Sequence, residues 1–139
     1  MKTKIKSVYI ASPYSPCTQL QKLPVVADLV RRARFHRINL IEAHLTDMTG
    51  YAFVCPITQS HTLARYVKFD EGFASWKDID FKHIRDCDEV WVIMMKDWDK
   101  SIGVQAEIKY AKRLKKPLRY LPDDIEDIRY ELKLQGEIE

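Results

Sequence analysis

The sequence lacks any run of apolar residues close to the roughly 20 that a membrane span requires. The N-terminal residues Met1-Lys2-Thr3-Lys4 are not followed by the apolar core of a signal peptide. Patterns typical of disulfides and zinc sites are lacking too, because the three cysteines, Cys17, Cys55 and Cys87, are odd in number and have no paired spacing. We therefore expect a soluble cytoplasmic protein that holds no metal ion and no cofactor.

Charge of one sign does not predominate either. Lys and Arg number 23, Asp and Glu number 20, and the formal net charge is +3. Because the two signs are mixed along the chain, we expect no nucleic-acid polymer as a partner, although mild basicity helps to attract anionic small molecules. The 139 residues, 46% of them hydrophobic, fit one packed domain that spans residues 1–139.

Apolar patterns of two periods alternate along the chain. Short continuous apolar runs are typical of strands covered on both faces, and a period of 3.6 residues is typical of helices. The runs predict strands at Ser7–Ala11, Tyr51–Cys55, Glu89–Met95 and Leu118–Leu121, and the helical period predicts helices at Pro24–Thr49, Ser75–Asp86, Gly103–Lys116 and Asp123–Gln135. We expect Ile57–Gly72 to be an active-site loop with some helix.

This alternation predicts a three-layer α/β fold of the Rossmann-like or flavodoxin-like type, with a mostly parallel sheet of roughly four to five strands and helices on both faces. In the long first helix, closed by Gly50, the residues expected to share one apolar face are Val26, Leu29, Val30, Ala33, Leu40 and Ile41. Parallel sheets bind ligands beyond the carboxyl ends of their strands. That rule places Ser12–Pro16, Ile57–His61 and Lys96–Gly103 along one rim.

Two carboxylates lie where apolar residues are expected. At about 100° per residue, Glu107 falls between Ala111 and Leu114 on the apolar face of its helix, and Asp80 lies on the apolar face of the preceding helix. An ionised carboxylate on an inward face costs free energy unless it is paired, hydrogen-bonded or used. Two such acids near one rim suggest the pair that cleaves a glycosidic bond, in which one acid attacks the anomeric carbon and the other handles protons.

Each acid also has a structural interpretation. Glu107 can lie at the edge of its apolar stripe and reach water. Asp80 can be an acid favoured by the dipole at a helix N-terminus, or the salt-bridge partner of Arg34 or Arg37. The sequence leaves these alternatives open.

Several motifs occur in a fixed order: the apolar strand and tight loop Val8–Ser12, then Asp80 followed by Asp88, then Ser101–Glu107 opening a helix, then Lys115-Lys116-Pro117. Over roughly residues 5 to 121, the chain resembles the superfamily of nucleoside 2-deoxyribosyltransferases and deoxynucleoside 5′-monophosphate N-glycosidases. Its segments Ser12–Ser15, Pro56–His61 and Gly103–Glu107 resemble those of a branch of small bacterial and phage proteins.

The resemblance implies roles for particular residues. Glu107 corresponds to the nucleophile that forms a covalent glycosyl-enzyme intermediate. Asp80 corresponds to the acid that binds the sugar and handles the proton of the leaving base, and Tyr9 to the tyrosine that orients the nucleophile. Ser101 and Gly103 lie at a helix N-terminus that suits a 5′-phosphate. The resemblance also implies a homodimer or a larger homo-oligomer.

The chain departs from the phosphate-binding relatives after its first strand. Those relatives have a glycine-rich loop there, whereas this chain has Ser12-Pro13-Tyr14-Ser15-Pro16, which lets fewer backbone amides approach a phosphate. The hydroxyls of Ser12 and Ser15, or the side chain of Arg34, are candidates to replace it.

Three further residues are candidates for substrate binding. Tyr14 and Trp98 can stack on a nucleobase, and His61 can contact the base or a phosphate. The alternatives are that Trp98 is a hydrophobic lid over the turn Asp97–Asp99, and that His61 is a surface or capping residue.

These expectations combine into one functional hypothesis. We expect cleavage of the N-glycosidic bond of a deoxynucleoside or its 5′-monophosphate, by hydrolysis or by 2-deoxyribosyl transfer, through a covalent intermediate on Glu107. One alternative is a nucleotide-binding or sensing module without catalysis, since fold does not fix function. Another is an interaction protein that keeps the fold without its chemistry.

Overall fold

The computed structural model describes residues 4–64, 66 and 73–139. Its strands are β1 (Ser7–Ala11), β2 (Ala52–Val54), β3 (Glu89–Ile93) and β4 (Leu118–Leu121). Its helices are α1 (Pro24–Thr49), α2 (Pro56–Leu63), α3 (Phe73–Asp86), α4 (Ile102–Arg113) and α5 (Ile125–Leu134), with one 3-10 turn, η1 (Trp98–Lys100).

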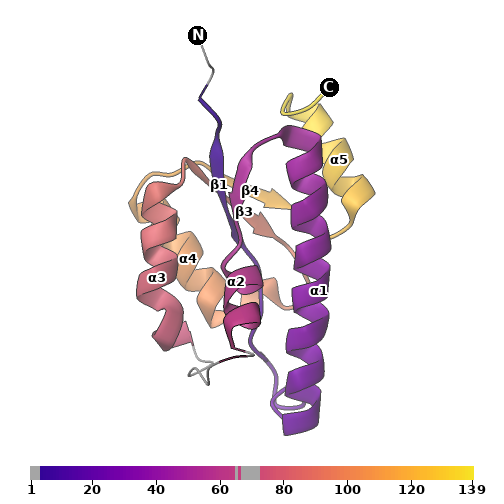
Figure 1. Ribbon diagram of the computed structural model, residues 1–139, viewed down its shortest axis with the longest axis vertical. Coiled ribbons are helices and arrows are strands. Elements are labelled where there is room, and N and C mark those ends of the chain that lie inside the picture. The colour runs from indigo at the N-terminus through magenta and orange to yellow at the C-terminus, as the bar shows by residue number, and fades with distance from the viewer. Residues whose placement is uncertain (1–3, 65, 67–72) are drawn as a thin grey trace.

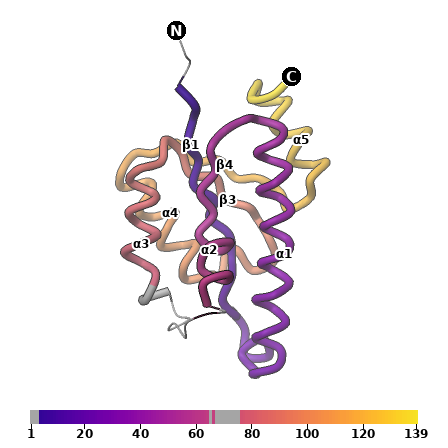
Figure 2. The backbone as a smooth tube through the Cα atoms, viewed as in Figure 1, coloured from indigo at the N-terminus to yellow at the C-terminus, as the bar shows by residue number. Residues whose placement is uncertain are grey.

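The four strands form one parallel sheet in the order β2-β1-β3-β4. Figures 1 and 2 show α3 and α4 on one side of this sheet and α1 and α5 on the other. The three-layer α/β fold with helices on both faces is therefore confirmed. Among the described helices, none combines the length and the apolar character that crossing a bilayer would take.

Alternate residues of the two central strands pack on different faces of the sheet, because successive side chains of a strand point to opposite faces. Val8 and Ile10 of β1 join Trp91 of β3 in the core under α1 and α5. Tyr9 of β1 joins Val90 of β3 in the core under α3 and α4. Because both faces of these strands are covered, both sets of alternate residues are apolar, which explains the continuous apolar runs in the sequence.

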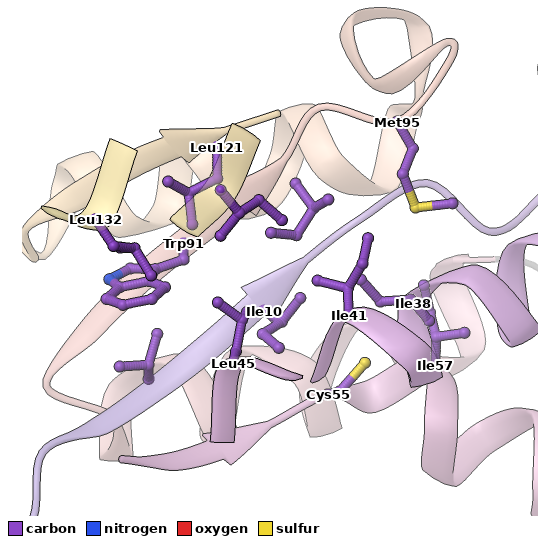
Figure 3. Packing of buried hydrophobic residues seen from close by; sticks show 13 residues of the cluster. Ile10, Ile38, Ile41, Leu45, Cys55, Ile57, Trp91, Met95, Leu121 and Leu132 are labelled. Carbon is purple, nitrogen blue, oxygen red and sulfur yellow. The ribbon is translucent and has the colours of Figure 1, made fainter. Parts of the chain in front are cut away.

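The larger core lies between the sheet and the pair α1 and α5. Figure 3 shows Leu45 of α1 beside Ile10 of β1, and Leu132 of α5 beside Trp91 of β3. All of these side chains are almost completely buried. Because each such side chain contributes roughly 1.5–3 kcal/mol of burial free energy, this core fixes the long helix across the sheet.

The bounds of α1 confirm the predicted helix. Pro24 occupies the first turn, where its missing N–H costs nothing, and Gly50 caps the C-terminus at φ 70°, donating its N–H to the Thr46 carbonyl.

The predicted buried face of α1 is wrong except at Ile41, which is buried as expected. Leu29 is 56% exposed and Leu40 is 47% exposed. The buried residues are Ala27, Arg34, Ile38, Ile41 and Leu45. Two apolar stripes run along this helix, and the sheet covers the one that contains a buried arginine, which apolar periodicity cannot select.

Several other boundaries differ from the expected ones. The second strand is shorter than predicted, and the expected loop Ile57–Gly72 contains α2 over Pro56–Leu63, while residues 65 and 67–72 lie outside the described residues. Helix α3 begins at Phe73, two residues earlier than expected, and this shift bears on the role of Asp80.

The amino ends of the strands carry a charged cluster around Glu137. Its carboxylate accepts hydrogen bonds from Arg119 at 2.6 Å and from the Tyr51 hydroxyl, and it lies 3.5 Å from the Lys6 ammonium. Burial raises the pKa of Glu137, but the hydroxyl and the two cations outweigh it, so the net pKa lies below the ordinary 4.5. The cluster ties the segment after α5 to β4 and to the residues that immediately precede β1 and β2.

We expect Glu137→Gln to lower the free energy of unfolding by about 1–2 kcal/mol at neutral pH, because charge-assisted hydrogen bonds are lost. A carboxylate whose pKa is depressed on folding stabilises above its unfolded pKa and loses this effect as the pH falls through its folded pKa. Thermal unfolding should therefore show the deficit shrinking below about pH 4.5. The exposed Glu139→Gln is the control, and an equal deficit in both variants would contradict the prediction.

Candidate active site

A cavity of about 360 Å³ opens at the carboxyl ends of the strands. Such a volume suits a small molecule. Its wall comes from the loop after β1, from α2 and α3, and from the first turns of α4. The rim expected from the sequence is therefore a real concave site, and it brings together side chains from segments far apart in the chain.

Glu107 lies on the floor of this cavity and is only 5% exposed. It belongs to the buried stripe of α4 together with Val104, Ile108 and Ala111. The fully buried Tyr9 of β1 donates its hydroxyl hydrogen bond to Glu107 Oε2. The interpretation that Glu107 reaches water at the edge of its stripe is therefore wrong.

Asp80 of α3 lines the same cavity and is 7% exposed. Its Oδ1 atom has no hydrogen-bond partner among the described residues. Arg34 pairs with Asp97 and Arg37 donates to the Asp123 carbonyl, so neither is the salt-bridge partner of Asp80. Asp80 also lies well beyond the first turn of a helix that begins at Phe73. Both structural interpretations of Asp80 are wrong.

The two acids have raised pKa values. Burial raises the pKa of Glu107, the Tyr9 hydrogen bond lowers it, and the charge of Asp80 raises it further, to about 8. Burial raises the pKa of Asp80 to about 7. The pKa of Tyr9 is raised by burial and then by the charges of both acids, so Tyr9 remains a donor. Near neutral pH the pair retains a proton that isolated carboxyl groups would have lost.

Hydroxyl and amide groups also line the cavity. Ser12 is 6% exposed, and its hydroxyl has no hydrogen-bond partner among the described residues. Ser101 caps α4, accepting the Val104 N–H at 3.3 Å, and Gly103 follows in the first turn. The N–H groups and the positive dipole end of this helix suit an anionic group.

The other predicted site residues divide into two groups. Tyr14 and Ser15 line the cavity. His61 lies behind Tyr14, with its Nδ1 2.7 Å from the Tyr14 hydroxyl and its ring stacked on Phe35 at 4.1 Å. Trp98 is outside the cavity wall, with its ring 5.8 Å from that of Tyr120. The structure therefore brings Tyr14 and Ser15 to the acids but not His61 or Trp98.

Some residues of the wall were not singled out from the sequence. Trp76 lies one helical turn before Asp80 and lines the cavity beside it, a position that its spacing of four residues could have indicated. Lys22 and Lys100 also line the cavity, but Lys22 precedes α1 and Lys100 ends the three-residue turn η1, and neither position gives a periodic signal in the sequence. Across the described ranges, no three His, Cys, Asp or Glu side chains gather closely enough to hold a metal ion.

A sequence model of the family described as a domain of unknown function (DUF1937) matches residues 6–121. The chain belongs to this family. The DUF1937 match runs from before β1 to the end of β4 and so includes every element that lines the cavity, whereas α5 lies beyond it. A comparison with curated proteins gives no match.

The raised pKa of Glu107 predicts how stability depends on pH. A carboxyl group whose pKa is raised on folding stabilises fully below its unfolded pKa, near 4.5, and this effect is lost as the pH rises through its folded pKa, near 8. Gln cannot ionise, so we expect Glu107→Gln to gain stability relative to the wild type as the pH rises from about 5 to about 9. Urea unfolding at a series of pH values measures this.

The control for this experiment is Glu126→Gln, whose side chain is 79% exposed. Its stability should follow that of the wild type at every pH. Parallel curves for Glu107→Gln and the wild type would show that Glu107 ionises as easily in the folded protein as in the unfolded chain.

Proposed function

We propose that this protein cleaves the N-glycosidic bond of a deoxynucleoside or a deoxynucleoside 5′-monophosphate. The observation that carries this proposal is the pair of buried acids, Asp80 and Glu107, which share one cavity and have raised pKa values. Perturbed acids that face each other across a cleft are typical of catalytic sites.

In the proposed reaction, the Glu107 carboxylate attacks C1′ of the sugar and the C1′–N bond breaks. In the reacting form of the singly protonated pair the proton is on Asp80, which gives it to the departing base. Water then attacks C1′ of the glycosyl ester, Asp80 takes a proton from that water, and the sugar leaves Glu107 as a carboxylate. Tyr9 donates to the attacking carboxylate from behind and keeps it oriented. In 2-deoxyribosyl transfer, a second base would take the place of water in the second half of the reaction.

The choice of substrate rests on the cavity wall and on the resemblance to deoxyribosyltransferases. A 2′-deoxy sugar lacks the electron-withdrawing hydroxyl and so favours the oxocarbenium-like transition state. The N-terminus of α4, with Ser101 and Gly103, supports a 5′-phosphate, and Lys22 and Lys100 in the wall add positive charge. By the same resemblance, we expect a homodimer or larger assembly.

We expect purified protein to release a free base from at least one member of a panel of deoxynucleosides and their monophosphates, as measured by chromatography. Glu107→Gln should abolish this release, because an amide is a poor nucleophile of nearly the same shape. Mass spectrometry of quenched wild-type reactions should detect the glycosyl ester on Glu107. Glu42→Gln, which removes another carboxyl with a raised pKa, is the matched control and should keep full activity.

Two outcomes would contradict the proposal. Base release by Glu107→Gln at a rate near that of the wild type would exclude the covalent route. Thermal stabilisation by a nucleotide with no release of base would instead identify a binding module.

The two pKa values predict a bell-shaped dependence of kcat/KM on pH, because the reaction needs one acid ionised and the other protonated. The pair should titrate in two steps, near 7 and near 8, with maximal activity between them. Asp80→Asn should lower the rate by about 100-fold or more, since the proton donor is lost. It should also leave a single ascending limb at lower pH, because the charge of Asp80 no longer raises the pKa of Glu107. An unchanged bell in that variant would exclude Asp80 as the acid.

A further inference from the structure

A buried ion pair lies directly behind the cavity. Arg34 Nη2 of α1 is 3.6 Å from Asp97 Oδ2, and the side chains are 9% and 8% exposed. Asp97 lies in the connection between β3 and α4, just before η1. Neither residue lines the cavity.

The other end of the Arg34 guanidinium holds the loop that forms the cavity wall. Nη1 donates to the carbonyl of Ser15 at 2.6 Å and to that of Tyr14 at 3.2 Å. Because a trans peptide group is planar, its N–H points away from its carbonyl. The N–H of Ser15 is therefore directed away from Arg34, while the Tyr14 and Ser15 side chains line the cavity.

Asp97 connects this loop to the segment that leads into α4. Gln21 Nε2 donates to Asp97 Oδ2 at 2.8 Å, and Gln21 Oε1 accepts the Cys17 N–H at 2.8 Å. Lys100, which lines the cavity, lies 3.9 Å from Asp97 Oδ1. Asp97 has a φ of 70°, a left-handed conformation that Asp tolerates better than most residues. One carboxylate thus joins α1, the loop after β1 and the approach to α4.

A buried ion pair is a poor source of stability, because desolvation of both charges offsets their attraction. It does impose geometry, since the planar fork of Arg fixes two acceptors at once. A binding loop built around Pro13 and Pro16, rather than around glycines, has few backbone amides with which to adapt to a ligand. Its carbonyls must be held away from the ligand by another group, and Arg34 is that group.

We propose that Arg34 and Asp97 are positioning residues, which hold the segment Ser12–Cys17 in the conformation that binds the substrate. This proposal rests on the proposed function for its kinetic consequences. Its structural part concerns the order of the loop and can be measured without turnover.

Cys17 provides that measurement. It is partly buried, lines the cavity, and lies with its Sγ 3.5 Å from the Ser15 carbonyl and 4.0 Å from that of Asp97. Cys55 and Cys87 are 7% and 3% exposed. The rate at which iodoacetamide alkylates the native protein therefore reports on the loop, and a bound nucleotide should slow it.

The informative variant is Arg34→Lys, which keeps one positive charge but lacks the second nitrogen of the planar group, so it cannot hold the two carbonyls and Asp97 at the same time. Arg37→Lys is the matched control, because Arg37 lies on the same helix and donates to a carbonyl away from the cavity. Asp97→Asn tests the other partner. Each protein is assayed for Cys17 alkylation by mass spectrometry, for its melting temperature, and for kcat and KM of base release.

We expect Arg34→Lys and Asp97→Asn to speed alkylation of Cys17 by about fivefold or more and to raise KM by about tenfold, with kcat within about threefold of the wild type. The nucleotide concentration that halves the alkylation rate of Cys17 should rise by the same factor as KM. Arg37→Lys should match the wild type in alkylation and in KM, even if its melting temperature falls.

The proposal is overturned if Arg34→Lys and Arg37→Lys show the same alkylation rate and the same KM. It is also overturned if activity is lost only in proportion to the unfolded fraction. If the wild type releases no base, the proposed function is wrong, and the alkylation rates alone decide whether Arg34 orders the loop.

Discussion

The hydrogen bond from Tyr9 to Glu107 joins the centre of the sheet to the helix that forms the floor of the cavity. Tyr9 is a residue of β1, which pairs with β2 on one side and β3 on the other, so its position is fixed by two ladders. A buried carboxyl needs a donor, and only one rotational setting of α4 offers Glu107 to this hydroxyl. That setting also packs Val104 and Ile108 on the sheet and directs the N-terminus of α4 to the cavity.

The acids at the two ends of the sheet have pKa values shifted in opposite directions, because their neighbours differ. Glu137, at the amino ends of the strands, is surrounded by Lys6 and Arg119, and its pKa is lowered. Glu107 and Asp80, at the carboxyl ends, both have raised pKa values: burial raises both, the Tyr9 hydrogen bond lowers that of Glu107, and the charge of Asp80 raises that of Glu107 further. A cation placed beside the pair would keep both ionised and remove the proton that a leaving base needs.

Much of this arrangement could be predicted from the sequence, because it follows from local patterns. Continuous apolar runs identify the central strands, and a carboxylate within an apolar helical stripe identifies Glu107 and Asp80 as unusual. The buried face of α1 could not be predicted in the same way. Both of its faces carry apolar residues, and the face that is buried includes Arg34, whose partners are the Tyr14 and Ser15 carbonyls and Asp97, 63 residues further along the chain.

The directions of side chains near the rim escape sequence patterns for a related reason. Trp98 lies in the three-residue turn η1, and His61 lies in the last turn of the short helix α2, which the sequence predicted only as a loop with some helix. Their sequence positions near the rim therefore do not determine which way they point. Trp98 packs near Tyr120 of β4, and His61 stacks on Phe35 of α1. The conformation of a loop depends on the groups that hold it. For the segment Ser12–Cys17 these groups are Arg34 and Asp97. The geometric role of their buried charges cannot be found by counting apolar residues.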